Sequence, residues 1–138
     1  MKKIKIYLDG GARGNPGPAA IGFVVKNQNN RIIFQQGQTI GWATNNQAEY
    51  QALITALTWI KNNQCQTEII DFFLDSQLVV KQMRGEYKIK SAKIKPLWQK
   101  AKELEAELQP AGINYYLIPR SLNQEADFLL NQALNLVK

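Results

Sequence analysis

The sequence contains no histidine and a single cysteine, Cys65. Without histidine, a Ser-His-Asp triad, a histidine general base and a Cys/His zinc site are all excluded. One cysteine also excludes a disulfide within the chain. Any catalytic metal ion must therefore be bound through oxygen atoms, which favours Mg²⁺ or Mn²⁺ over softer metals.

Long apolar runs are missing as well, since none approaches the roughly 20 residues that a membrane-spanning helix needs. The Lys-rich start leads into alternating polar and apolar residues, whereas a signal peptide would continue into an apolar stretch. The chain has 138 residues, of which 45% are apolar and 20% charged, as in one globular domain. We expect a single domain over residues 1–138 that is cytoplasmic, monomeric and without membrane contact.

Positive charge is concentrated in one segment, residues 81–102. The chain carries 17 Lys and Arg against 11 Asp and Glu, a net charge of +6. Eight of the basic residues lie in this segment with one acidic residue, Glu86, so the rest of the chain is close to neutral. A single lysine is explained by a solvated helix face, but a surplus of this size predicts a patch for a polyanion such as nucleic acid.

The hydrophobic pattern predicts an α/β fold. Alternation and short apolar runs predict strands at residues 3–9, 21–27, 31–42, 68–75 and 113–119. Helical spacing predicts helices at 44–63, 76–84, 94–108 and 121–137. Thr44 or Asn45 would cap the first helix, and Ser121 with Gln124 forms a capping-box pattern before the last, whose apolar face ends at Val137. This order predicts a five-stranded mixed sheet, three antiparallel strands followed by parallel ones, flanked by helices.

Four acidic residues stand out by their positions. Asp9 and Asp75 are each the residue at which an apolar strand is predicted to end, so their carboxylates can meet at the edge of the sheet where ligands bind in such folds. Glu49 lies early in a predicted helix, and Asp127 lies beside the apolar face of another. Taken singly, each is also explained as a turn former, a cap or a partner of the helix dipole. If the four converge, their mutual repulsion calls for cations.

The stretch "GGARGNPG" directly after Asp9 could be a phosphate-binding loop, an ordinary turn or backbone that approaches a large ligand. It has neither the Lys-Ser/Thr of a P-loop nor a following helix, and a predicted strand comes next. A nucleotide-binding module is therefore disfavoured, and the other two interpretations stay open on these residues alone.

Four blocks of the sequence resemble, in the same order, the signature blocks of type 1 ribonuclease H. They read "YLDGGARGNPGPAAIGFVV", "ATNNQAEYQALITAL", "FLDSQLVVKQMRGEYK" and "IPRSLNQEADFLLNQAL". The resemblance covers essentially the whole chain and implies the ribonuclease H-like fold. It further implies an endoribonuclease that hydrolyses the RNA strand of RNA/DNA hybrids and leaves 5′-phosphate and 3′-hydroxyl ends.

The resemblance also implies a site. Two Mg²⁺ ions, for which Mn²⁺ can substitute, would be held by Asp9, Glu49, Asp75 and Asp127. Glu49 would lie toward the leaving oxygen and Asp127 toward the attacking water. Substrate contacts along the minor groove, where the 2′-hydroxyls of RNA are displayed, are implied for Gly10, Gly11, Asn15, Asn45, Asn46 and Gln77. Thr44 matches a residue of the family's pocket for a DNA phosphate.

The sequence departs from the family pattern at three places. Arg120 stands where many members carry a histidine, and we expect it to act on the 5′-phosphate product. A basic insertion seen in some members is reduced to Lys88, Lys90, Lys93 and Lys95. Trp42 lies two positions before Thr44, where some relatives place an arginine. Short forms without histidine resemble the archaeal-like branch, some of which also cleave RNA/RNA duplexes.

Two other classes of function stay open. The same fold occurs in structure-selective DNA nucleases and integrases, although the "TNN" and "DSQ" blocks argue against these. A non-catalytic nucleic-acid-binding domain would keep the basic segment and usually lose a carboxylate. All four carboxylates are present, which favours an enzyme.

Overall fold

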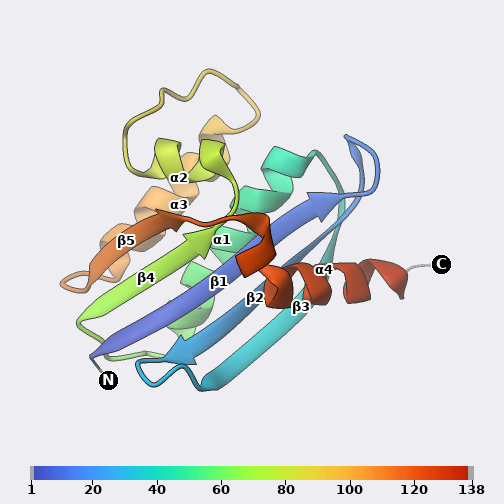
Figure 1. The fold of residues 1–138 in the computed structure, drawn as a ribbon. Helices are drawn as coiled ribbons and strands as arrows, with labels where there is room; N and C mark the ends of the chain where they lie inside the picture. The colour runs from blue at the N-terminus through green and yellow to red at the C-terminus, as the bar shows by residue number, and fades with distance from the viewer. Residues whose placement is uncertain (1, 137–138) are drawn as a thin grey trace.

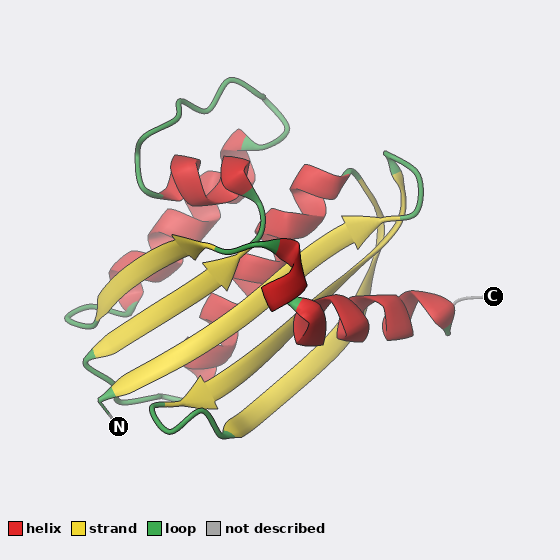
Figure 2. Cartoon of the chain, in the orientation of Figure 1, coloured by secondary structure: helices red, strands yellow, loops and turns green. Residues whose placement is uncertain are grey.

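The computed structural model describes residues 2–136, which form one five-stranded sheet with helices on both faces (Figures 1 and 2). The strands are β1 (Lys3–Ala12), β2 (Gly17–Asn27), β3 (Ile32–Ala43), β4 (Ile69–Leu74) and β5 (Gly112–Leu117). Their spatial order is β3-β2-β1-β4-β5. β2 pairs antiparallel with β1 and β3, whereas β4 pairs parallel with β1 and β5. The predicted mixed sheet is confirmed.

The helices are α1 (Asn45–Asn62), α2 (Gln77–Met83), α3 (Lys95–Glu107) and α4 (Gln124–Asn135), with a 3₁₀ turn at Arg120–Leu122. α1 packs on one face of the sheet and α3 packs on α1, while α4 crosses β2 and β3 on the opposite face (Figure 1). Fully buried apolar side chains, such as Phe23, Leu53 and Phe72, fill the main core. None of the described helices is both long and apolar enough to cross a lipid bilayer.

The predicted start of α1 is confirmed at Thr44. Its Oγ1 accepts a hydrogen bond from the backbone N–H of Gln47 at 3.1 Å, and its own N–H donates to Oε1 of Gln47 at 2.9 Å. This reciprocal pair satisfies two backbone donors that the first turn of a helix leaves free. The chain therefore turns from β3 directly into α1, which places Asn45 and Asn46 at the carboxyl edge of the sheet.

β1 is longer than the sequence predicts. The apolar alternation ends at Asp9, yet Gly10, Gly11 and Ala12 still pair with β2, so the expectation that the strand stops at Asp9 is wrong. Glycine carries no side chain that could contribute to a periodic pattern, and the pairing is made by the backbone alone. Asp9 consequently lies inside a strand and is only 4% exposed.

The predicted capping box before the last helix is also wrong. Ser121 lies in the 3₁₀ turn, and α4 begins at Gln124 with Asn123 as its N-cap. Asn123 makes no capping bond with its side chain, because its amide points inward and donates to the carbonyl of Leu8 at 2.8 Å. The apolar face of α4 is otherwise as predicted up to Leu134, and Val137 lies outside the described residues.

Two glycines of the sheet allow both flanking helices to approach its backbone closely. A Cβ atom on Gly10 would lie 2.1 Å from the carbonyl oxygen of Ala48 in α1. A Cβ atom on Gly22 would lie 2.3 Å from the carbonyl oxygen of Ala126 in α4. Both distances are far inside van der Waals contact, so any side chain there would push the helix away. Because Gly22 pairs with Asp9 in the sheet, the two close contacts lie beside that carboxylate.

We predict that Gly22→Ala lowers the free energy of unfolding by about 2 kcal/mol or more, because the added methyl group overpacks the contact with α4. Urea denaturation measures this change. Gly112→Ala is the matched control, since a Cβ there meets nothing closer than 3.7 Å and should change stability by less than about 0.5 kcal/mol. Equal effects of the two substitutions would contradict the packing role of Gly22.

Candidate active site

The structure brings the four predicted acidic residues to one pocket. Asp9 of β1, Glu49 of α1 and Asp75, which follows β4, have carboxylate oxygens within 4.8 Å of one another. All three line a cavity of about 310 Å³, and Asp127 of α4 lies in the same wall. Asp127 is not part of the tight group of three. The pocket therefore has an inner acidic triad and an outer carboxylate.

Strand register and helix packing position these side chains. Tyr7 of β1 is paired in parallel with Phe73 of β4, and Asp9 and Asp75 each lie two residues further along. Since side chains alternate along a strand, both carboxylates point to the same side at the carboxyl edge of the sheet. Glu49 joins them because α1 approaches β1 at Gly10.

Burial and mutual repulsion make the protonated forms of two of these groups unusually stable. Burial, followed by the charge of Asp75, raises the pKa of Asp9 from its ordinary value of 3.8 to about 7. Burial, followed by the charge of Asp9, raises the pKa of Glu49 well above its ordinary range. The Oε2 atom of Glu49 is buried without a hydrogen-bond partner among the described residues. A divalent cation would satisfy this oxygen and neutralise the triad, so the donor set fits Mg²⁺ or Mn²⁺.

Asn123 supports the triad and was missed by the sequence analysis. Its Nδ2 donates to the carbonyl of Leu8 and lies 3.3 Å from Oδ2 of Asp75. One buried amide thus links β1, the segment after β4 and the start of α4. Its position directly before an acidic helix start resembles an ordinary N-cap, which hid this role in the sequence.

The glycine-rich loop is tied to the start of α1 by two asparagines. Oδ1 of Asn45 accepts from the N–H of Ala12 at 2.9 Å, and Oδ1 of Asn15 accepts from the N–H of Asn45 at 3.0 Å. Gly10, Gly11 and Asn45 line the acidic pocket. Gly10 therefore both borders the pocket and packs against α1, whereas the sequence analysis expected only a substrate-facing role.

A second cavity, of about 400 Å³, lies on the other side of the α1 start. We call it the basic pocket, and its wall contains Asn15, Thr44, Asn46, Gln47, Gln82, Lys88, Lys90, Ser91 and Lys93, with Leu78 and Ile94. Of the four predicted lysines, Lys95 is the one that does not line it. Lys95 is the first residue of α3, beyond the connecting segment that carries the other three.

Arg120 lies at the rim of the acidic pocket, and Gln77 lies in the hollow next to it. Arg120 lines both this pocket and a neighbouring hollow that also contains Asp75 and Gln77. Nε2 of Gln77 donates to the hydroxyl of Tyr87 at 3.2 Å. Arg13 and Asn131 also line the acidic pocket and were not predicted. Asn131 lies one helical turn after Asp127, which is the signal that could have found it.

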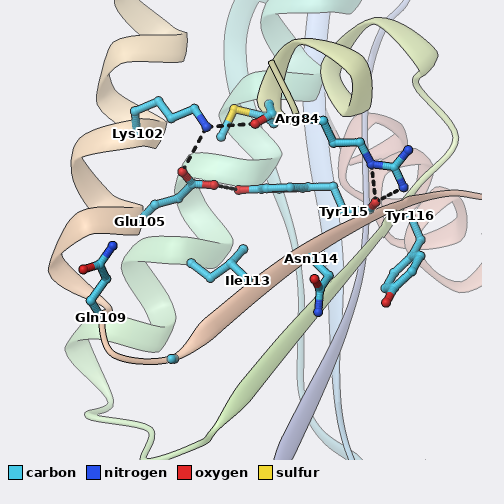
Figure 3. A pocket seen from close by; sticks show the side chains of 10 residues that line it. Arg84, Lys102, Glu105, Gln109, Ile113, Asn114, Tyr115 and Tyr116 are labelled. Carbon is cyan, nitrogen blue, oxygen red and sulfur yellow. Dashed lines mark hydrogen bonds and ion pairs between the residues drawn. The ribbon is translucent and has the colours of Figure 1, made fainter. Parts of the chain in front are cut away.

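Another hollow, of about 390 Å³, lies between α3 and β5 (Figure 3) and is larger than the acidic pocket. Its charged groups are already paired with the protein. Lys102 contacts Glu105 and the carbonyl of Met83, Glu105 accepts from the hydroxyl of Tyr115, and Arg84 donates to the carbonyl of Tyr115. Arg84 thereby occupies one backbone acceptor on the free edge of β5, which disfavours pairing with another strand there. The charged groups of this hollow therefore stabilise the edge strand β5 and its contact with α3, and we assign them no ligand.

The fold and the site together indicate one class of protein. In this class a mixed sheet has helices on both faces, and carboxylates at its strand ends can bind divalent cations. The family model described as "Reverse transcriptase-like" matches residues 7–133. The ribonuclease HI of Halobacterium salinarum is 40% identical over 133 residues, which cover 96% of this chain and 65% of that protein. The bifunctional protein Rv2228c of Mycobacterium tuberculosis is 39% identical over 96% of this chain and 36% of its own length.

Solved structures agree with these relatives. The crystal structure of RNase H1 from Halobacterium salinarum has a TM-score of 0.90 at 39% identity and covers 96% of this chain and 98% of that chain. LC11-RNase H1, solved in complex with an RNA/DNA hybrid, has a TM-score of 0.91 at 39% identity, with 96% of both chains covered. The chain belongs to the type 1 ribonuclease H family, as its four sequence blocks predict. Members of this family use divalent metal ions, in agreement with the acidic triad.

The raised pKa of Asp9 predicts a pH-dependent response to metal. Between pH 3.8 and about 7 the folded protein holds the Asp9 proton more tightly than the unfolded chain, so this group's contribution to stability is lost as pH rises through about 7. A bound cation requires the ionised carboxylate. We therefore expect Mg²⁺ to raise the midpoint of thermal unfolding more at about pH 8 than at about pH 5, relative to EDTA.

Asp9→Asn provides the matching variant. Without metal at about pH 8 it should unfold at a higher temperature than the parent protein, because one repelling charge is removed. It should also lose most of the Mg²⁺ effect. Equal Mg²⁺ shifts at both pH values, or an unchanged shift in the variant, would contradict a metal site at the triad.

Proposed function

We propose that this protein hydrolyses the RNA strand of RNA/DNA hybrids, with two Mg²⁺ ions as cofactor and Mn²⁺ as a possible substitute. The observation that carries the proposal is the acidic triad of Asp9, Glu49 and Asp75, with Asp127 beside it, at the carboxyl edge of the sheet. The hybrid complex of LC11-RNase H1 supports the choice of substrate. The chain spans 65% of the length of the Halobacterium protein and 36% of that of Rv2228c, so the activity and substrate are proposed for this chain on the strength of its own site.

The four carboxylates would hold the ions. Asp9 in β1 and Asp75 directly after the neighbouring β4 would both hold the ions, while Glu49 and Asp127 approach from α1 and α4 on opposite faces of the sheet. When bound, two divalent ions stabilise negative charge on a phosphate and make an attacking water more acidic. The protein's part is to fix the four carboxylates in position, and bound cations would offset the burial and repulsion that raise the pKa of Asp9 and Glu49. With water made more acidic by the ions, no histidine is needed as a base.

The start of α1 would separate the two strands of the substrate. Asn45 lines the acidic pocket, whereas Thr44 and Asn46 line the basic pocket, where Lys88, Lys90 and Lys93 can bind phosphates. A strand in the acidic pocket is cut, so the strand in the basic pocket is the uncut DNA strand. Gly10, Gly11, Asn15 and Gln77 would lie along the minor groove between them, where 2′-hydroxyls distinguish RNA.

Arg120 would bind the 5′-phosphate of the product. It is exposed at the rim of the acidic pocket, and its guanidinium can form a bidentate contact with phosphate. In this position it would stand in for the histidine that many members of the family carry.

The test is cleavage of a labelled RNA/DNA hybrid in Mg²⁺, Mn²⁺ and EDTA, with RNA/RNA, DNA/DNA and single-stranded RNA in parallel. We expect metal-dependent cutting of the RNA strand, with 5′-phosphate ends. Asp9→Asn should lower the rate by at least about 100-fold, since a direct ligand matters more than an outer partner of a metal site.

Asp71→Asn is the matched control. Asp71 is equally buried in the sheet, but it pairs with Lys3 at 3.3 Å and accepts from Asn114, outside the acidic pocket. Its cleavage rate should stay close to that of the parent. Full activity of Asp9→Asn, or no cleavage by a folded parent that binds the hybrid, would contradict the proposal.

A further prediction concerns the basic pocket. Lys90→Gln should weaken hybrid binding and reduce the slope of log K against log salt by about 0.8, because one phosphate contact and its counterion release are lost. Lys95→Gln removes an equal charge outside this pocket and should leave the slope unchanged. Binding titrations at several salt concentrations measure both. Identical slopes for the two variants would show that the basic pocket does not hold a strand.

A further inference from the structure

Trp42 is an aromatic side chain that the proposed cleavage does not use. It lies at the end of β3 and is 71% exposed, whereas Trp59 and Trp98 pack against the core. The strand pairing shifts just before it, since Ala20 pairs with Thr39 and Ala19 with Gly41, which leaves Ile40 as a bulge. A bulge redirects the side chains that follow it and is frequent next to functional sites.

The indole borders a hollow of about 340 Å³, which we call the Trp42 groove. Its wall contains Ile40, Trp42, Ala43, Gln47, Gln51, Lys93, Pro96 and Leu97. Gln47 and Lys93 also line the basic pocket, so the two hollows are neighbours that share a wall. Among the residues that the structure describes, neither wall includes an acidic side chain. The groove therefore extends the path proposed for the uncut strand.

This combination of groups is suited to an unpaired nucleotide. A free indole face can stack on a base, Lys93 can bind a phosphate, and the amides of Gln47 and Gln51 can contact base edges of any kind. Bases inside a duplex already stack on their neighbours and offer no free face. A stacking surface beside a duplex-binding pocket therefore fits the point at which one strand continues alone.

We propose that the Trp42 groove binds single-stranded DNA where the uncut strand continues beyond the end of the RNA/DNA hybrid. The inference rests on the proposed function, because the basic pocket must hold the uncut strand for the groove to extend it. It adds a substrate preference, for hybrids that adjoin a single-stranded DNA tail. Since the groove lies on one side of the acidic pocket, a tail at one end of the DNA strand should bind and a tail at the other end should not.

The experiment measures fluorescence anisotropy of labelled hybrids in EDTA, so that no cleavage occurs. Three substrates are compared, namely a blunt hybrid and the same hybrid with a short DNA tail at the 5′ or the 3′ end of its DNA strand. One tail should raise the affinity of the parent protein about tenfold. Trp42→Ala should abolish that gain and leave the affinity for the blunt hybrid unchanged, and Trp42→Phe should keep most of it.

Tyr116→Ala is the matched control, because it removes an exposed aromatic side chain from β5, at the opposite edge of the sheet. It should retain the full gain from the tail. The inference is overturned if neither tail raises affinity, if both tails raise it equally, or if Trp42→Ala weakens binding of blunt and tailed hybrids alike. The last result would place the indole against the duplex instead.

Cleavage of the blunt hybrid in Mg²⁺ separates this inference from the proposed function. Cleavage by the parent and by Trp42→Ala, with no gain from a tail, would refute the groove alone. A gain from the tail that depends on Trp42, without cleavage of any hybrid, would refute the proposed activity and leave the groove as a binding site.

Discussion

The contact of two helices with bare glycine backbone is the constraint on which the acidic pocket depends. α1 meets β1 at Gly10, and α4 meets β2 at Gly22, each at a distance that leaves no room for a side chain. Because Gly22 is paired with Asp9, the two contacts bring Glu49 and Asp127 to the same point of the sheet from opposite faces. Strand register adds Asp75 from β4. The geometry of the pocket is thus a consequence of backbone packing, not of attraction between the side chains.

Without bound cations, such a pocket lowers the stability of the folded protein. Burial, followed by mutual repulsion, disfavours the charged forms of these carboxylates, and the raised pKa values of Asp9 and Glu49 express that cost as retained protons. The apolar core beneath α1, together with the sheet pairing, must stabilise the fold against this repulsion. A functional site that lowers stability is a frequent compromise in enzymes. The same repulsion favours the binding of divalent cations, which carboxylate oxygens can hold.

Much of this arrangement is predictable from sequence, because periodicity and strand ends are local properties. The alternation in β1, the apolar run of β4 and the cap at Thr44, one of the two residues proposed for it, all predict what the structure contains. The four acidic residues could be predicted as site residues from their positions in the four sequence blocks that resemble type 1 ribonuclease H. Asn123 could not be found in this way, since its inward hydrogen bond to Leu8 depends on a contact between distant parts of the chain.

The remaining features also depend on tertiary packing. A glycine that permits close approach looks the same in a sequence as a glycine in a turn, so neither Gly22 nor the extension of β1 beyond Asp9 was visible. The placement of Lys95 outside the basic pocket follows from where α3 begins. Trp42 lies on the edge strand β3 and follows a one-residue bulge, and a bulge appears only when two strands are seen in register.

The central claim is that the acidic triad is a divalent metal site. The most direct test is an anomalous diffraction map from crystals of the protein soaked in Mn²⁺ at about pH 8. We predict an anomalous peak in the acidic pocket, in contact with carboxylate oxygens of Asp9 and Asp75. Ordered crystals whose acidic pocket shows no peak, or in which Mn²⁺ binds only elsewhere, would contradict it.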